Sequence, residues 1–242
     1  MIGAVFAAAV CTVSAQAPAA PPASEKKPTW DTSAALGFTL TKGNSDTVTF
    51  NANINTVKKW EQNEVKLGAD ATYGENDGEK NADTLHGFGQ YNRLFTDRAY
   101  GYARLDALRD DIAGIDYRFT FGPGIGYYFI KKEDRQLSGE FGPAFIYEKE
   151  EGSSATGYFT LRLAERFDQK LNDHVKIWQS LEILPQVDDF ENFIVNAEVG
   201  VEAALSAKLS LRAFVQDSYD NQPANDRKKN DLRLVTALAY KF

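Results

Sequence analysis

From residue 30 onward, apolar and polar residues alternate in one run after another along the chain. In the clearest run, residues 47–58, apolar side chains occupy every second position from Val48 to Ile54, with threonine and asparagine between them. A period of two predicts β-strands with one apolar and one polar face. Similar runs occupy residues 65–73, 159–163, 175–183, 193–202 and 232–242. Each suits a tilted membrane-crossing strand of roughly 9–11 residues.

Two kinds of turn-like segment separate these runs. Longer acidic segments alternate along the chain with shorter segments. The longer ones include residues 75–81, 148–154 and 220–231, and the shorter ones include residues 96–98 and 206–208. Long outer loops and short periplasmic turns are typical of outer-membrane barrels. The chain is therefore predicted to be all-β: a transmembrane antiparallel β-barrel of about 12 strands in an up-and-down meander, with its acidic loops facing outward.

The charged residues fix which face meets lipid. A shift of one residue would place Arg162, Glu198 or Glu202 in hydrocarbon, and a lipid-facing arginine at the midplane costs roughly 2–4 kcal/mol. A soluble β-sandwich or lipocalin, the competing fold, would place its apolar face inside and would need no aromatic belts. In residues 99–109 the orientation stays open, because Tyr100 and Tyr102 oppose two apolar residues. On the lipid-facing parity, aromatic residues form two girdles: Trp30, Trp60, Phe95, Phe129, Phe167 and Tyr240 near periplasmic ends, and Tyr73, Tyr117, Tyr147 and Tyr219 near outer ends.

The two ends of the chain carry export features. Residues 1–15 are predicted to be a signal peptide, although they lack a basic n-region, and residues 16–29 an Ala/Pro-rich flexible segment. Residues 30–242 form the predicted barrel. The alternating Leu238, Tyr240 and Phe242 are typical of the terminal signal that outer-membrane assembly machinery reads.

Composition excludes several functions. The chain has 34 acidic and 27 basic residues and a net charge of −7, which argues against nucleic acid as a partner. It has two histidines, one methionine and one cysteine, Cys11, in the segment predicted to be removed. We therefore expect no metal and no cofactor. The acidic loop 75–79 lacks the full spacing of a calcium loop. The expected partners are outer-membrane lipid and lipopolysaccharide, the assembly machinery, and small ions or polar solutes.

The inward positions carry charges of both signs. If residues 206–208 form a tight turn, Glu202 lies opposite Arg212 on neighbouring strands, which stabilises such a pair. The charges either brace a filled lumen or set the field of a narrow pore for ions and small polar solutes. The predicted lumen network consists of Arg162, Glu182, Glu198, Glu202, Arg212 and Arg233.

An outer-membrane enzyme, similar to a phospholipase or a protease, is the alternative function. Such a lipase needs a serine, a histidine and an orienting group within hydrogen-bond reach. His86 is predicted to point into the lumen and His174 to lie in a periplasmic turn, and neither has an evident serine beside it. The adjacent Asp110 and Asp111 are more typical of a solvated loop than of a protease. We therefore predict no catalytic residues.

Several short motifs occur in a recognisable order: residues 37–40 (GFTL) with 43–46 (GNSD), 109–118 (RDDIAGIDYR), 122–127 (GPGIGY), 140–144 (EFGPA) and the terminal Tyr-x-Phe. With them, residues 30–242 resemble the salt-induced outer-membrane protein family, a Gram-negative family of unknown function. The resemblance implies an outer-membrane location and a link to salt or osmotic stress. It implies no activity and no catalytic residues.

Overall fold

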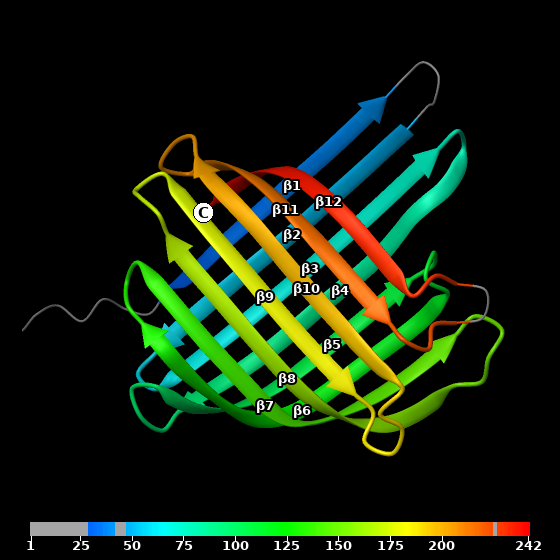
Figure 1. The fold of residues 1–242 in the computed structure, drawn as a ribbon. Helices are drawn as coiled ribbons and strands as arrows, with labels where there is room; N and C mark the ends of the chain where they lie inside the picture. The colour runs from blue at the N-terminus through cyan, green and yellow to red at the C-terminus, as the bar shows by residue number, and fades with distance from the viewer. Residues whose placement is uncertain (1–28, 42–46, 225–226) are drawn as a thin grey trace, which may run out of the picture.

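The computed structural model describes residues 29–41, 47–224 and 227–242. Its twelve strands form one closed antiparallel barrel (Figure 1). The predicted signal peptide, nearly all of the Ala/Pro-rich segment and the acidic turn 42–46 lie outside the described residues. The strands are β1 Trp30–Thr41, β2 Thr47–Trp60, β3 Asn63–Asn76, β4 Glu79–Leu94, β5 Ala99–Asp110, β6 Ile115–Lys131, β7 Arg135–Glu150, β8 Thr156–Lys170, β9 Val175–Pro185, β10 Phe193–Ala204, β11 Leu209–Asp220 and β12 Asn230–Lys241.

Each strand pairs with the next along the chain, as a meander requires, and β12 returns to β1. The predicted fold class is thereby confirmed. Because consecutive strands are antiparallel, successive turns lie at opposite ends of the barrel. The short turns therefore gather at one end and the acidic segments at the other. We name these ends the periplasmic end and the outer end.

The outer wall of the barrel is apolar. Phe38, Phe121 and Leu234 point away from the interior and are 65%, 53% and 74% exposed. Burial of neighbouring positions in the same strands, such as Ala35 at 1% and Val235 at 5%, follows the period of two. An apolar band around a polar interior is the arrangement that hydrocarbon surroundings stabilise, since the backbone of a closed barrel satisfies its own hydrogen bonds. No helix of the described residues is long and apolar enough to cross a membrane.

The orientation of β5, which the sequence left open, is set by its neighbour β6. Tyr100 and Tyr102 point inward and are 1% and 5% exposed, and Leu105 faces outward at 52%. Glycine makes room for both tyrosine rings: a Cβ at Gly126 would lie 2.2 Å from a ring carbon of Tyr100, and one at Gly124 would lie 2.5 Å from the hydroxyl of Tyr102. The tyrosines therefore lie flat against a strip of β6 that has no side chains.

The joint between the first and last strands is short. Only Ser33–Leu36 of β1 pair with Leu238–Lys241 of β12. Beyond these pairs, β1 is paired with β2 alone and β12 with β11 alone. Figure 1 shows β1 and β12 diverging from this joint, which lies at the periplasmic end.

Candidate functional site

The barrel interior is the candidate site, and one half of it is filled. Arg162 of β8 is at its centre with a side chain only 6% exposed. Its Nη1 donates to Oε2 of Glu140 at 2.7 Å and its Nε donates to Oε1 of Glu182 at 2.6 Å. The guanidinium also lies over the ring of Tyr102, 5.3 Å from the centroid. One cation is thus shared by two carboxylates from the neighbouring strands β7 and β9.

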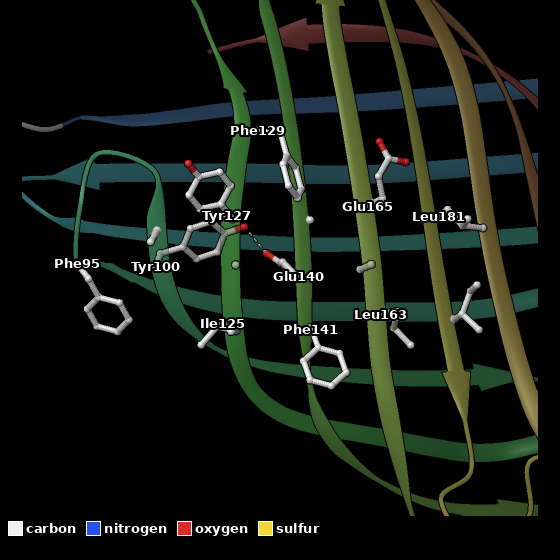
Figure 2. Close-up of a pocket in the computed structure, with 15 residues that line it drawn as sticks. Phe95, Tyr100, Ile125, Tyr127, Phe129, Glu140, Phe141, Leu163, Glu165 and Leu181 are labelled. Carbon is white, nitrogen blue, oxygen red and sulfur yellow. Dashed lines mark hydrogen bonds between the residues drawn. The ribbon is translucent and has the colours of Figure 1, made fainter.

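Amide and phenol side chains extend this cluster towards β3. The hydroxyl of Tyr100 donates to Oε1 of Glu140 at 2.9 Å, as Figure 2 shows. Gln90 donates to the same oxygen at 2.7 Å and to Oδ1 of Asn92 at 2.9 Å. Asn92 in turn donates to Glu64, whose side chain is 4% exposed and is paired with Lys59 at 3.0 Å. A continuous hydrogen-bonded network therefore crosses the inner wall from β2 to β9.

A second part of the filled half, nearer the outer end, is apolar. Ala144, Ile146, Leu184 and Ile194 form a buried cluster from β7, β9 and β10, and Tyr158 packs against it. The two clusters are formed by inward side chains of strands between β2 and β10. Ile146 is 0% exposed, so water does not reach this side chain.

The inner face along the middle of β2 and β3 is polar and partly accessible. Asn51, Asn53 and Asn55 face inward on β2, and Asn55 is exposed although it points into the barrel. On β3, the side chains of Lys66 and Asp70 are 29% and 40% exposed. Solvent therefore reaches inward-facing side chains on this side of the lumen.

Carboxylates in the lumen outnumber the cations that neutralise them at several points. Glu198 accepts hydrogen bonds from Trp178 Nε1 at 2.5 Å and Gln216 Nε2 at 2.9 Å, and within the described ranges it has no cationic partner within 4 Å. Asp70 is paired with His86 alone among the residues that the structure describes. Together with the two carboxylates that share Arg162, these groups are points of excess negative charge on the inner wall, whereas Glu64 has both Lys59 and Lys66 within 4 Å.

His86 has both ring nitrogens occupied. Nδ1 lies 2.9 Å from Oδ1 of Asp70, and Nε2 lies 3.4 Å from Oδ1 of Asp106. A general base must keep one nitrogen free for the proton it abstracts. Asp106 is itself held by Arg104 at 2.6 Å. The histidine is thus held as part of the lumen's charge network.

At the outer end, ion pairs connect strands on opposite sides of the barrel. Nη2 of Arg118 on β6 is 3.0 Å from Asp220 on β11, although β7 to β10 separate these strands around the wall. Nη2 of Arg233 on β12 is 2.6 Å from Asp110 on β5, with β1 to β4 between them. Arg118 also pairs with Glu148 of β7. We call the Arg118–Asp220 and Arg233–Asp110 pairs the outer latch, because they span the mouth of the lumen.

The described residues between β11 and β12 lie over the same mouth. Ala224 is 5% exposed. A Cβ on Gly114, in the turn between β5 and β6, would be 3.2 Å from the Cβ of Ala224 and 3.1 Å from Nε of Arg227. Arg227 is also 2.6 Å from Glu151 in the loop after β7. Loops from opposite sides of the barrel thus meet above the latch.

The outer turns contain a further charged group. Asp111 follows β5 and is paired with Lys80 at 2.9 Å. The ammonium of Lys80 donates a hydrogen bond to Asp111 and holds the pKa of that carboxyl below its usual range. In the part of the chain that is described, no three His, Cys, Asp or Glu side chains are grouped to hold a metal ion.

The structure places the predicted lumen residues at four separate places. Arg162 and Glu182 belong to the central cluster, and Arg233 belongs to the outer latch. Glu202 lies directly opposite Arg212, whose Nε is 2.9 Å from Oε2 of Glu202. Glu198 contacts none of these five residues in the described structure. The predicted residues are inward-facing, but they do not form one network.

The residues of the predicted terminal signal lie on the outer wall. Leu238, Tyr240 and Phe242 are 47%, 41% and 70% exposed. The rings of Tyr240 and Phe242 meet edge to face with centroids 5.2 Å apart. The backbone N–H of Phe242 donates to the carbonyl of Thr32 on β1.

Sequence reasoning missed Glu140 as the partner of Arg162, and Asp110 and Asp220 as partners across the mouth. Glu140 was recognisable as inward from its parity. The cross-barrel partners follow only from the three-dimensional shape of the mouth, and a strand-by-strand pattern carries no signal of them.

Several solved barrels have a similar structure at low sequence identity. The translocator domain of the autotransporter NalP from Neisseria meningitidis is 12% identical, with 88% of this chain and 87% of that chain covered and a TM-score of 0.49. The KdgM porin in complex with disordered oligogalacturonate is 8% identical, with 87% and 99% covered and a TM-score of 0.48. The NanC porin is 5% identical, with 87% and 97% covered and a TM-score of 0.49. Likeness at this level carries no information on solute or activity.

Sequence comparison gives a family but no activity. No curated protein matches the sequence. One family model, described as a protein of unknown function, DUF481, matches residues 34–242. This span covers nearly the whole barrel, and the description contains no reference to salt, so the link to salt stress stays a prediction. The chain belongs to the DUF481 family of proteins of unknown function.

Proposed function

We propose that this protein is a narrow, cation-preferring pore of the bacterial outer membrane, which the outer latch holds closed in the conformation described. The observation that carries the proposal is the partly accessible polar face along β2 and β3 inside a closed barrel. Asn55 and Asp70 point into the lumen and are still reached by solvent. A barrel whose only role is mechanical has no need of an inner surface that water can enter.

The sign of the preferred ion follows from the charges on the inner wall. In the described part of the chain, Glu198 has only neutral hydrogen-bond donors, and Arg162 is shared between Glu140 and Glu182. Rings of carboxylates are the usual device of cation channels. Small cations are therefore expected to enter the lumen more readily than anions.

The closed state follows from the geometry of the mouth. Arg118 and Asp110 have side chains that are 9% and 7% exposed, so the latch is largely shielded from bulk solvent. Charge pairs in such surroundings are screened by salt much less than exposed pairs. Opening requires both cross-barrel contacts to break together with the loop contacts above them.

Planar-bilayer recording in potassium chloride tests the pore. We expect the wild type to be mostly closed and Asp220→Asn/Arg233→Gln to conduct severalfold more current, because both cross-barrel attractions are removed. In this variant Arg118 keeps Glu148, and Asp110 keeps a hydrogen bond from Thr84 at 2.8 Å. Asp220→Asn alone is the milder variant, and unshifted electrophoretic mobility without heating checks that each protein is folded.

A matched control separates the latch from surface charge. Lys149→Met removes an outer ion pair of 2.7 Å with Asp116, but this pair joins the adjacent strands β7 and β6. Its conductance should equal that of the wild type. The cation preference is read from the reversal potential in a salt gradient, and Glu198→Gln should reduce it. Silence of the wild type and of both latch variants at every voltage would refute the pore.

Location and orientation are tested by labelling in a Gram-negative host. Gly152→Cys, in the loop after β7, should react with a membrane-impermeant maleimide in intact cells. Glu133→Cys, in the turn between β6 and β7, should react only after lysis. The reverse pattern would place the acidic loops in the periplasm.

The terminal signal is tested by Phe242→Ala, which should lower the yield of assembled barrel if the assembly machinery reads it.

The predicted link to salt stress has its own experiment. If the pore serves the response to salt or osmotic stress, a deletion strain should recover more slowly than its parent after a rise in external salt. Complementation with the wild-type chain should restore the recovery rate. Equal recovery of the two strains would remove the link and leave the conductance results untouched.

A further inference from the structure

One carboxylate lies on the lipid-facing side of the wall. Glu165 continues the outward parity of Phe159 and Leu163 on β8, and it pairs in register with Gly139 of β7 and Leu181 of β9. Oε2 of Glu165 accepts a hydrogen bond from Nε2 of Gln179, also outward, at 2.7 Å. An amide satisfies hydrogen bonding but leaves the negative charge in place. No Lys, Arg or His of the described chain lies within ion-pair distance of this carboxylate.

An apolar hollow of about 580 Å³ lies beside Glu165 on the same wall. Gly139 lines it without a side chain, and the ring of Phe129 lies close by, since a Cβ on this glycine would be 2.9 Å from that ring. Its sides include Tyr127, Phe141 and Leu181. Figure 2 shows Glu165 between Phe129 and Leu181, close to the rim of this hollow. The volume lies in the range of roughly 300–1,000 Å³ typical of small-molecule sites.

The depth of the site indicates what surrounds it. Phe129 and Phe95, which also lines the hollow, belong to the aromatic girdle near the periplasmic end. Aromatic girdles mark the level of the headgroups. An acyl chain would enter the hollow from the membrane, and the polar head of the same lipid would lie at the level of Glu165.

We propose that Glu165, Gln179 and this hollow form a binding site for a phospholipid with a primary-amine headgroup in the periplasmic leaflet. The ammonium group neutralises the Glu165 carboxylate and donates hydrogen bonds to it. An acyl chain covers Phe129, Phe141 and Leu181. The site does not depend on the pore, because it uses the opposite face of the wall.

Native mass spectrometry of the detergent-solubilised protein tests the site with lipids of identical acyl chains. Phosphatidylethanolamine should be retained about fivefold more than phosphatidylglycerol. This ratio corresponds to the free energy that one partly exposed ion pair contributes to binding. Glu165→Gln keeps the size and the hydrogen bond but removes the charge, so it should abolish the preference. Glu133→Gln removes a charge at the same end of the barrel and should leave the preference unchanged.

The hollow is tested separately. Gly139→Leu fills it and should weaken retention of both lipids, while far-ultraviolet circular dichroism confirms that the barrel is folded. Equal retention of the two lipids by the wild type, or an unchanged preference in Glu165→Gln, would overturn the proposal. So would a dimer that Glu165→Gln dissociates, since the carboxylate would then serve contact between two copies of the chain.

Discussion

Arg162→Met removes the guanidinium that joins Glu140 to Glu182. Methionine keeps an unbranched apolar side chain at this position but removes the guanidinium over Tyr102, so two carboxylates are left facing each other without a cation. The side chain is 6% exposed and its two ion pairs measure 2.7 and 2.6 Å. Removing one partner of such a buried pair costs about 3–5 kcal/mol. We expect a loss of this size in the free energy of unfolding.

Arg166→Met is the matched control on the same strand. The Arg166 side chain is 47% exposed and its pair with Asp168 measures 2.8 Å. An exposed pair contributes about 0–1 kcal/mol. Removing Arg166 therefore tests the loss of an arginine from β8 without leaving two buried carboxylates without a cation.

The assay is equilibrium urea unfolding in phospholipid vesicles, followed by the fluorescence of Trp30, Trp60 and Trp178. Arg162→Met/Glu182→Gln removes one of the two stranded charges and should recover part of the stability that the single variant loses. Two results would refute the reasoning: equal losses in Arg162→Met and Arg166→Met, or no recovery in the double variant. Either would mean that water in the lumen compensates the uncovered carboxylates.

The same unfolding assay tests the glycine strip: Gly126→Ala, whose Cβ would lie 2.2 Å from a ring carbon of the buried Tyr100, should lose about 1–3 kcal/mol. Gly87→Ala, with its nearest atom at 3.7 Å, should stay within about 0.5 kcal/mol, and equal losses would contradict the packing argument. At the outer end, Lys80 lowers the pKa of Asp111. The ion pair between Lys80 and Asp111 is therefore fully present above the usual value of 3.8, and it is lost as the pH falls from there through the lowered pKa. Lys80→Met should raise that pKa towards the usual value in a carboxyl nuclear magnetic resonance titration, and an unmoved titration would show that the pair does not form in solution.

The alternation of residue types was sufficient to predict the architecture. It gave the strand number, the meander and the inward face of most strands, because a one-residue slip would have exposed charges such as Arg162 to lipid. β5 was the exception, and the physical reason lies outside β5. Whether Tyr100 can face inward depends on Gly126 of the neighbouring strand, and no pattern within one strand contains that information.

The candidate site was predictable only in part. Glu202 and Arg212 face each other through a tight turn, so their pairing follows from local register. Arg118 and Asp220 meet because the mouth is narrowed, and this depends on the tilt and curvature of the whole wall. Glu165 is a different case. Its outward position follows when the alternation of β8 is extended by two residues. However, the faces of the strands were assigned by keeping charged side chains away from lipid, and a lipid-facing glutamate conflicts with that rule.

The short joint between β1 and β12 makes the ring mechanically uneven. Four residue pairs hold it, and every other neighbouring pair of strands shares a longer ladder. A force that widens the barrel would therefore separate β1 from β12 first and leave the other eleven strand pairings as one curved sheet. Ring closure is also the step that uses Leu238–Lys241, the segment next to Phe242, so the barrel becomes a circle only when this part of β12 has docked on β1.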